Sequence, residues 1–246
     1  MLGGLKVKKD PDSWLGLIDG IYSVSMTLLI VEAPTIILNV FHKESFIEKH
    51  AASIFDLLIF NLTLGLRLLG LMLLMFSVFI ICCDTWSFQR KQIQNMDTMD
   101  HLHSFYHGLG LFLIVAMPSI FIVRVDTKFA VNFKAEDLLT DWAIVIVIFF
   151  VYILLLLAEQ REHTFSSLKG NHRRKRINSF SIITLQSRLL FSVSIALLIL
   201  ASGFFGAPQQ IGVIYLPILA IRIMLDRAFR SFSRPFKLPF LLSRSI

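Results

Sequence analysis

Six long apolar segments follow one another along this sequence, and they constrain its fold more than any other feature. They cover residues 15–40, 54–83, 107–123, 138–158, 180–202 and 209–225. A helix of about 20 apolar residues spans the hydrocarbon core of a bilayer. Charged residues make up only 17% of the chain, against about 25% in soluble domains, and the mean hydropathy is +0.71. The sequence therefore predicts an all-α integral membrane protein with six transmembrane helices.

Lysine and arginine are distributed unevenly between the two sides that these six helices would define. Sixteen of them lie on the side that holds both termini, five lie on the other side, and three lie inside the segments. Cytoplasmic loops carry the excess of positive charge. We therefore expect a cytoplasmic head (1–14), a transmembrane domain (15–225) and a basic cytoplasmic tail (226–246), in the cell (inner) membrane. The net charge of +7 is explained by this topology, so nucleic acid is not an expected partner.

Motifs for enzyme chemistry are missing from the sequence. It has no nucleophile elbow, zinc-protease motif, P-loop or Cys-x-x-Cys pair, and its two cysteines are adjacent. We expect no enzymatic activity, no cofactor and no metal site. His101, His103 and His107 are expected to face solvent or the membrane interface; metal binding or proton sensing is the alternative.

The first apolar segment carries polar side chains that a simple anchor avoids. At about 100° per residue, Asp19, Ser23 and Thr27 follow one side of a helix, next to an apolar stripe. This stripe consists of Val24, Leu28 and Val31. Two interpretations stay open: the polar residues line a path for ions, or they only bond neighbouring helices.

Other charges also interrupt the apolar segments. An ionisable group in a span is costly wherever it faces lipid, so Glu32, Arg67 and Arg188 should face protein. We expect Arg67 to point towards Glu32 or Asp56, and we hypothesise that Arg188 pairs with Asp19, which should lie at a comparable depth. Pro34 is expected to kink or end the first helix.

The first segment resembles the signature helix of the endolysosomal potassium channel family (transmembrane protein 175 type) and its single-repeat bacterial relatives. The likeness is carried by Asp19-Gly20, Ser23-Val24, Thr27-Leu28-Leu29-Ile30-Val31-Glu32 and Pro34. Phe79 and Trp86 have the spacing of the family's second-helix Phe and Trp, and Pro118 matches a third-helix proline. The Arg-x-x-x-Phe-Ser-Asp motif is degenerate, since Ser13, Leu17 and Ile18 replace its first three defined residues, and Gln89 replaces a second-helix histidine.

The resemblance implies four subunits around one pore. Val24, Leu28 and Val31 would match the hydrophobic constriction, and Ser23 and Thr27 the hydroxyl positions that favour potassium. Asp19, Gly20 and Trp86 would match the motif and its packing against the second helix.

We therefore expect a passive channel for potassium or another monovalent cation, a homotetramer in contact with membrane lipids. One alternative is a non-conducting membrane scaffold or effector with the same fold. The other is a proton-coupled secondary transporter that uses Asp19, Glu32 or Arg67.

Overall fold

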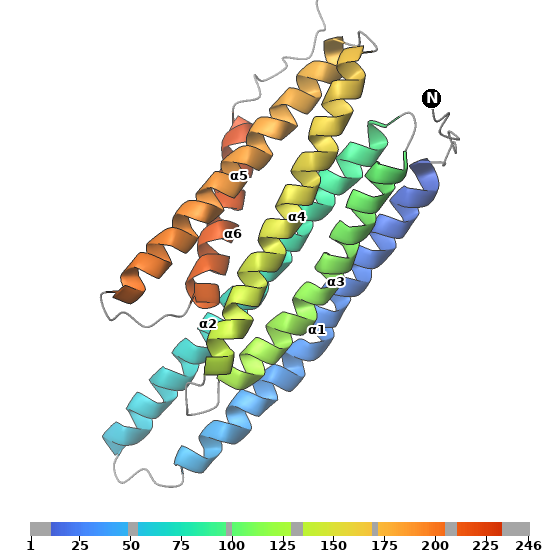
Figure 1. Cartoon of the computed structure of the whole chain (residues 1–246). Coiled ribbons are helices and arrows are strands. Elements are labelled where there is room, and N and C mark those ends of the chain that lie inside the picture. The colour runs from blue at the N-terminus through green and yellow to red at the C-terminus, as the bar shows by residue number, and fades with distance from the viewer. Residues whose placement is uncertain are drawn as a thin grey trace, which may run out of the picture.

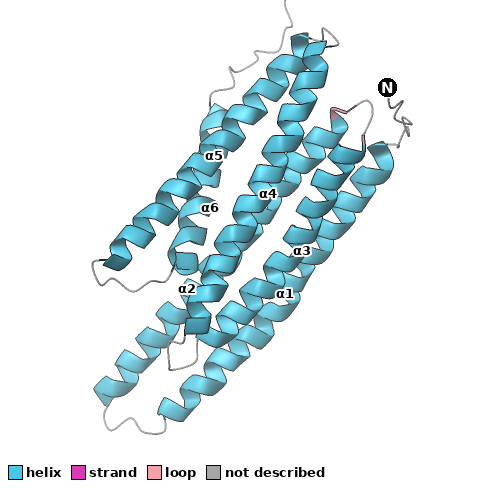
Figure 2. Cartoon of the chain, in the orientation of Figure 1, coloured by secondary structure: helices cyan, strands magenta, loops and turns pink. Residues whose placement is uncertain are grey.

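The computed structural model describes residues 11–48, 54–96, 100–128, 135–168, 172–204 and 211–232. Nearly all of these residues are helical, and the described part contains no strand (Figure 2). The helices are α1 (Pro11–Glu48), α2 (Ile54–Gln94), α3 (His101–Lys128), α4 (Ala135–Leu168), α5 (His172–Phe204) and α6 (Ile211–Phe232). The all-α expectation is confirmed for the described chain.

The helices form an elongated bundle in which consecutive helices run in opposite directions (Figure 1). The beginning of α1 and the end of α6 lie at the same end of this bundle, which we call the terminal end. The helix α1 packs on α2 and α3, α4 packs on α3 and α5, and α6 packs on α2 and α4. The bundle thus has an α1–α3 side and an α5–α6 side, joined by α2 and α4.

The helices are longer than the predicted apolar segments. The helix α1 continues through the predicted connector as far as Glu48, and α2 continues from Cys83 to Gln94. Hydropathy identifies the apolar part of a helix, but the helix itself can continue into polar sequence beyond that part. Pro34 does not end α1, which runs on for more than three turns beyond it.

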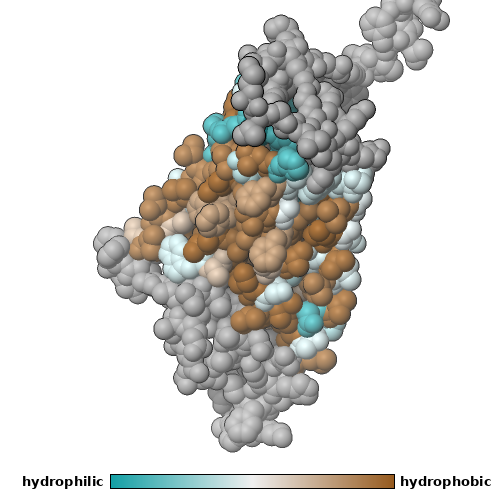
Figure 3. Space-filling model, turned by 45° about the vertical axis from the view of Figure 1, so that its right-hand side comes forward, coloured by the Kyte–Doolittle hydropathy of each residue, from teal (hydrophilic) through white to brown (hydrophobic). Residues whose placement is uncertain are grey.

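Five helices are long and apolar enough to cross a membrane by length and composition: the windows are Ser13–Leu38, Asn61–Gln94, His101–Val123, Asp141–Thr164 and Ser181–Ala201. The helix α6 is described from Ile211 onwards and carries four charged residues in its C-terminal half. The face seen in Figure 3 is largely apolar over the described residues, with most of its hydrophilic residues near the terminal end. These features are compatible with a multi-pass membrane protein. Most of the predicted head and of the predicted tail lies outside the described residues.

Side chains at helical spacing build the core. On α1, Ile18, Tyr22, Leu29 and Ile36 are buried at intervals of four or seven residues, so one face of α1 packs on its neighbours. The helix α4 supplies the most buried face of the five candidate spans, as its central position between α3, α5 and α6 requires. The opposite face of α1 is left outside the core of the single chain.

Candidate functional site

The residues predicted to line a pore lie on the exposed face of α1. The exposed fractions of Val24, Leu28 and Val31 are 57%, 39% and 62%, and Ser23 and Thr27 are also exposed. The Thr27 hydroxyl donates to the Ser23 carbonyl at 2.8 Å, which leaves the acceptor lone pairs of the Thr27 oxygen unused by this bond. In the described single chain, this face is exposed and presents both hydroxyl and aliphatic groups.

A second group of predicted residues connects α1 to α2. The Trp86 indole Nε1 donates to Asp19 Oδ1 at 2.8 Å, and Arg90 Nη1 lies 3.4 Å from Asp19 Oδ2. The Arg90 guanidinium also stacks over the Trp86 ring at 5.3 Å. We call Asp19, Trp86 and Arg90 the Asp19 cluster. It fixes the rotation of the first half of α1, because both oxygens of one carboxylate are held by α2. Gly20, next to Asp19, is exposed and has open space around its Cα.

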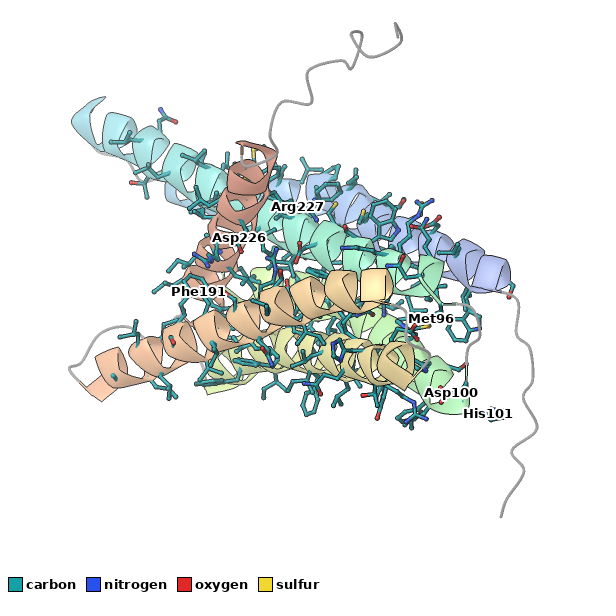
Figure 4. The ribbon with its side chains drawn as sticks, turned by 90° about the horizontal axis from the view of Figure 1, so that it is seen from above. Met96, Asp100, His101, Phe191, Asp226 and Arg227 are labelled. Atoms are coloured by element: carbon teal, nitrogen blue, oxygen red, sulfur yellow. The ribbon has the colours of Figure 1, made fainter. Side chains whose placement is uncertain are left out.

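A third group, centred on the buried Asp84, joins four helices. Asp84 of α2 accepts a hydrogen bond from the Tyr152 hydroxyl of α4 at 3.0 Å through Oδ2. Its Oδ1 lies 3.1 Å from Arg188 Nη2 of α5 and 3.2 Å from Arg227 Nη2 of α6. Arg227 Nη2 lies also 3.5 Å from the Cys83 carbonyl oxygen. We call Asp84, Tyr152, Arg188 and Arg227 the Asp84 cluster. Figure 4 shows Arg227 on α6 where this helix crosses α2.

The hypothesis that Arg188 pairs with Asp19 is wrong. Asp19 and Asp84, the carboxylate that Arg188 contacts, both lie on the half of the bundle near the terminal end. Asp19, however, is held by α2 on the α1–α3 side, whereas Arg188 belongs to α5 on the other side. Similar depth does not bring two helices together when α2 and α4 separate them. Arg188 is almost fully buried, with an exposed fraction of 2%, and its guanidinium packs over the Phe88 ring at 5.7 Å.

Asp84, Tyr152 and Arg227 were not singled out by the sequence analysis. Asp84 follows the apolar segment 54–83, where the sequence predicts a polar connector, but it is 1% exposed. The signal that could have identified it is the helical spacing of the buried α2 side chains, which continues past Cys83. This buried α2 face includes Leu71, Val78, Ile81, Thr85, Phe88 and Gln92. A face that stays periodic through a polar stretch indicates that the polar residues on it are buried too.

The three histidines divide differently from the prediction. His101 is exposed, but His103 and His107 are each 1% exposed, so the expectation that they face solvent or the interface is wrong for these two. The His103 Nδ1 lies 2.6 Å from Asp100 Oδ1, and Arg161 Nε of α4 donates to Asp100 Oδ2 at 3.0 Å. Burial alone would raise the pKa of Asp100, but the hydrogen bonds from His103 and Arg161 outweigh it and lower the pKa to about 2. Asp100 therefore stays ionised and ties the start of α3 to α4 (Figure 4).

Glu32 and Arg67 are the other two charges expected to face protein inside the apolar segments. Glu32 is partly buried on α1, and the side chain of Arg67 lies outside the part that the structure describes. The described residues contain no group of three His, Cys, Asp or Glu side chains arranged to hold a metal ion. The described part thus offers an exposed α1 face and a buried ionic network as its two candidate sites.

No family model matches this chain, and no curated protein or solved structure matches it either.

Proposed function

We propose that the chain assembles as a homotetramer and conducts potassium or another small monovalent cation passively through a pore lined by α1. The observation that supports this most directly is the composition of the exposed face of α1. Ser23 and Thr27 supply hydroxyl oxygens there, and the aliphatic side chains of Val24, Leu28 and Val31 lie beside them. The resemblance of the same residues to the potassium channel signature helix supports the proposal independently of their exposure.

A pore lined by this face needs several copies of the chain. The face lies outside the core of the single subunit, and in this proposal symmetric copies of the chain enclose it. Rings of valine and leucine side chains would then form an apolar constriction that conducts or closes by wetting and dewetting. Hydroxyl oxygens next to such a ring would partly replace the hydration shell of a cation.

The Asp19 cluster supports the same proposal by setting the orientation of α1. Both Asp19 oxygens are held by α2, so the first half of the helix cannot rotate without losing the bonds to Trp86 and Arg90. Thr27 lies about two turns further along α1 than Asp19. The rotation that the cluster fixes is therefore passed on to the pore-lining positions.

The test is a potassium flux assay with purified protein in proteoliposomes. Val24→Ala, Leu28→Ala and Val31→Ala each widen the proposed constriction and should change conductance or selectivity. Leu198→Ala is the matched control, because Leu198 is exposed to a similar extent but lies on α5, away from the proposed pore-lining face of α1. Currents that stay unchanged in all three variants, or a particle that remains a monomer in native mass spectrometry, would refute the proposal.

A second candidate is a non-conducting membrane scaffold with the same fold, and one observation favours it. Ile18 replaces the serine of the signature motif and is fully buried, so an apolar contact stands where the family has a polar one. Tetramers that form normally but carry no cation flux in the proteoliposome assay would support this candidate over the channel.

A further inference from the structure

The guanidinium of Arg188 keeps hydrogen-bond donors that no described residue satisfies. Its Nη2 contacts Asp84, but its Nε and Nη1 are buried and have no hydrogen-bond partner in the described part of the chain. Arginine carries five N–H donors and cannot give up its proton in a protein. A buried donor without an acceptor costs about 1–3 kcal/mol, and more when it is charged. The site therefore needs an acceptor beyond Asp84.

Two buried hydroxyl groups, of Ser192 and Tyr215, lie on the same α5–α6 side of the bundle. Ser192 lies one helical turn beyond Arg188 on α5, and Tyr215 of α6 approaches both Ser192 and Tyr152. Both residues are buried, and their two hydroxyl groups interact with each other. Each hydroxyl can both donate and accept, so this side of the bundle places polar groups near the Nε and Nη1 of Arg188, which have no partner among the described residues.

The charges of the Asp84 cluster do not balance. One carboxylate faces two guanidiniums, and Tyr152 adds no charge because its hydroxyl donates to Asp84. The buried Asp84 balances the equally buried Arg188, so the excess positive charge belongs to the half-exposed Arg227, where an anion can compensate it. Both guanidiniums contact the same oxygen of Asp84, so an anion that binds one of them lies close to the other.

Arg227 places this excess charge at the surface of the bundle. Its side chain is 49% exposed while its Nη2 remains bonded to Asp84. It lies towards the C-terminal end of α6, at the terminal end of the bundle (Figure 1). Basic sites between transmembrane helices at the level of the headgroups are typical binding sites for lipid phosphates.

We propose that the α5–α6 side of the Asp84 cluster binds a phosphate-type oxyanion through Arg227 and Arg188. The oxyanion is carried by an anionic phospholipid headgroup or is free in solution, and the same donors serve both. Phosphate oxygens match the planar fork of a guanidinium in geometry and in charge. Bound there, the oxyanion neutralises the excess charge and accepts from the donors that Asp84 leaves over. This site is separate from the α1 face and does not depend on ion conduction.

The experiment measures binding to the purified full chain by native mass spectrometry and by thermal shift. The lipid probe is phosphatidylglycerol in nanodiscs of phosphatidylcholine, with nanodiscs of phosphatidylcholine alone as reference. The soluble probe is inorganic phosphate added to the protein in detergent, with chloride at equal ionic strength as reference. Arg227→Gln should weaken binding about tenfold, since it removes one charge-assisted contact.

Arg222→Gln is the matched control. Arg222 lies on the same helix with similar exposure, but it pairs with Asp226 at 3.4 Å and stacks on Phe191, and no bond joins it to Asp84. It should leave the affinity within about twofold of the wild type. Arg227→Lys keeps the charge without the fork and should bind with intermediate strength.

Binding of phosphatidylglycerol without inorganic phosphate would assign the site to a lipid headgroup, and the reverse result would assign it to a free oxyanion. The proposal is overturned if neither probe binds more strongly than its reference. It is also overturned if Arg222→Gln weakens binding as much as Arg227→Gln does, because the effect then reflects only the surface charge of α6.

Discussion

We predict that Asp84→Asn lowers the free energy of unfolding by about 3–5 kcal/mol. Asparagine has nearly the shape of aspartate, so packing is preserved and the lost quantity is the charge. Asp84 is almost fully buried and bonds Tyr152, Arg188 and Arg227, of which Arg188 is equally buried. Without the carboxylate, Arg188 becomes an uncompensated charge inside the bundle. The cost of this uncompensated charge, rather than the loss of one hydrogen bond, sets the size of the expected loss in unfolding free energy.

The assay is thermal unfolding of the purified protein in detergent, followed by circular dichroism. For a chain of this size about 1 kcal/mol corresponds to about 2–4 °C, so the midpoint should fall by about 6–20 °C. Asp19→Asn is the matched control, since it removes a carboxylate bonded to an arginine and a ring donor, but at a site where both charged partners are 39% exposed. Partly exposed pairs contribute about 0–1 kcal/mol.

A double variant separates charge from geometry. Arg188→Gln removes the buried charge, so Asp84→Asn combined with Arg188→Gln should be less destabilised than the sum of the single variants. The reasoning is refuted if Asp84→Asn costs no more than Asp19→Asn, or if the effects of the two single changes simply add.

Three further predictions concern the other contacts. Trp86→Phe keeps the ring but loses the indole donor to Asp19, and thermal unfolding should show a loss of about 1 kcal/mol; an unchanged midpoint would contradict the role of this bond. Gly110→Ala places a Cβ 2.8 Å from Gln89 Nε2, whose side chain is itself buried, whereas Gly108→Ala meets open space. Gly110→Ala should therefore be less stable than Gly108→Ala by about 1 kcal/mol or more, and equal midpoints would refute the close approach. The pKa of Asp100 is lowered from 3.8 to about 2, so its ionised form stabilises the fold above about pH 4 and this contribution is lost as the pH falls towards 2. The midpoint difference between wild type and Asp100→Asn should be constant above pH 4 and shrink below it; a difference that shrinks between pH 5 and 7 would contradict this assignment.

The sequence predicts the helices of this protein better than their partners. Long apolar runs identify where helices lie, because a bilayer requires about 20 such residues. The same runs placed Asp84 and His103 in a polar connector, although both are buried. Hydropathy averaged over a segment cannot show which face of a helix packs inward, and this face decides burial for a polar side chain.

The choice of ion-pair partner is also beyond the sequence. Arg188 and Asp19 are buried or partly buried charges of opposite sign, and pairing them was reasonable from depth alone. The structure gives each a different partner because α2 presents Asp84 and Trp86 on different sides of one helix, two residues apart. Asp84 faces α4, α5 and α6, while Trp86 faces α1. This division depends on the packing of six helices, which no local pattern encodes.

The Asp84 cluster has a consequence for the biosynthesis of the protein. Asp84 emerges from the ribosome 68 residues before Tyr152 and 143 residues before Arg227. Synthesis adds about 5–20 residues per second, so Arg227 is synthesised about 7–30 s after Asp84. During this interval the second helix carries an uncompensated charge, which disfavours its release into lipid. Nascent chains that end before α5 should therefore stay associated with the insertion machinery, and longer ones should leave it.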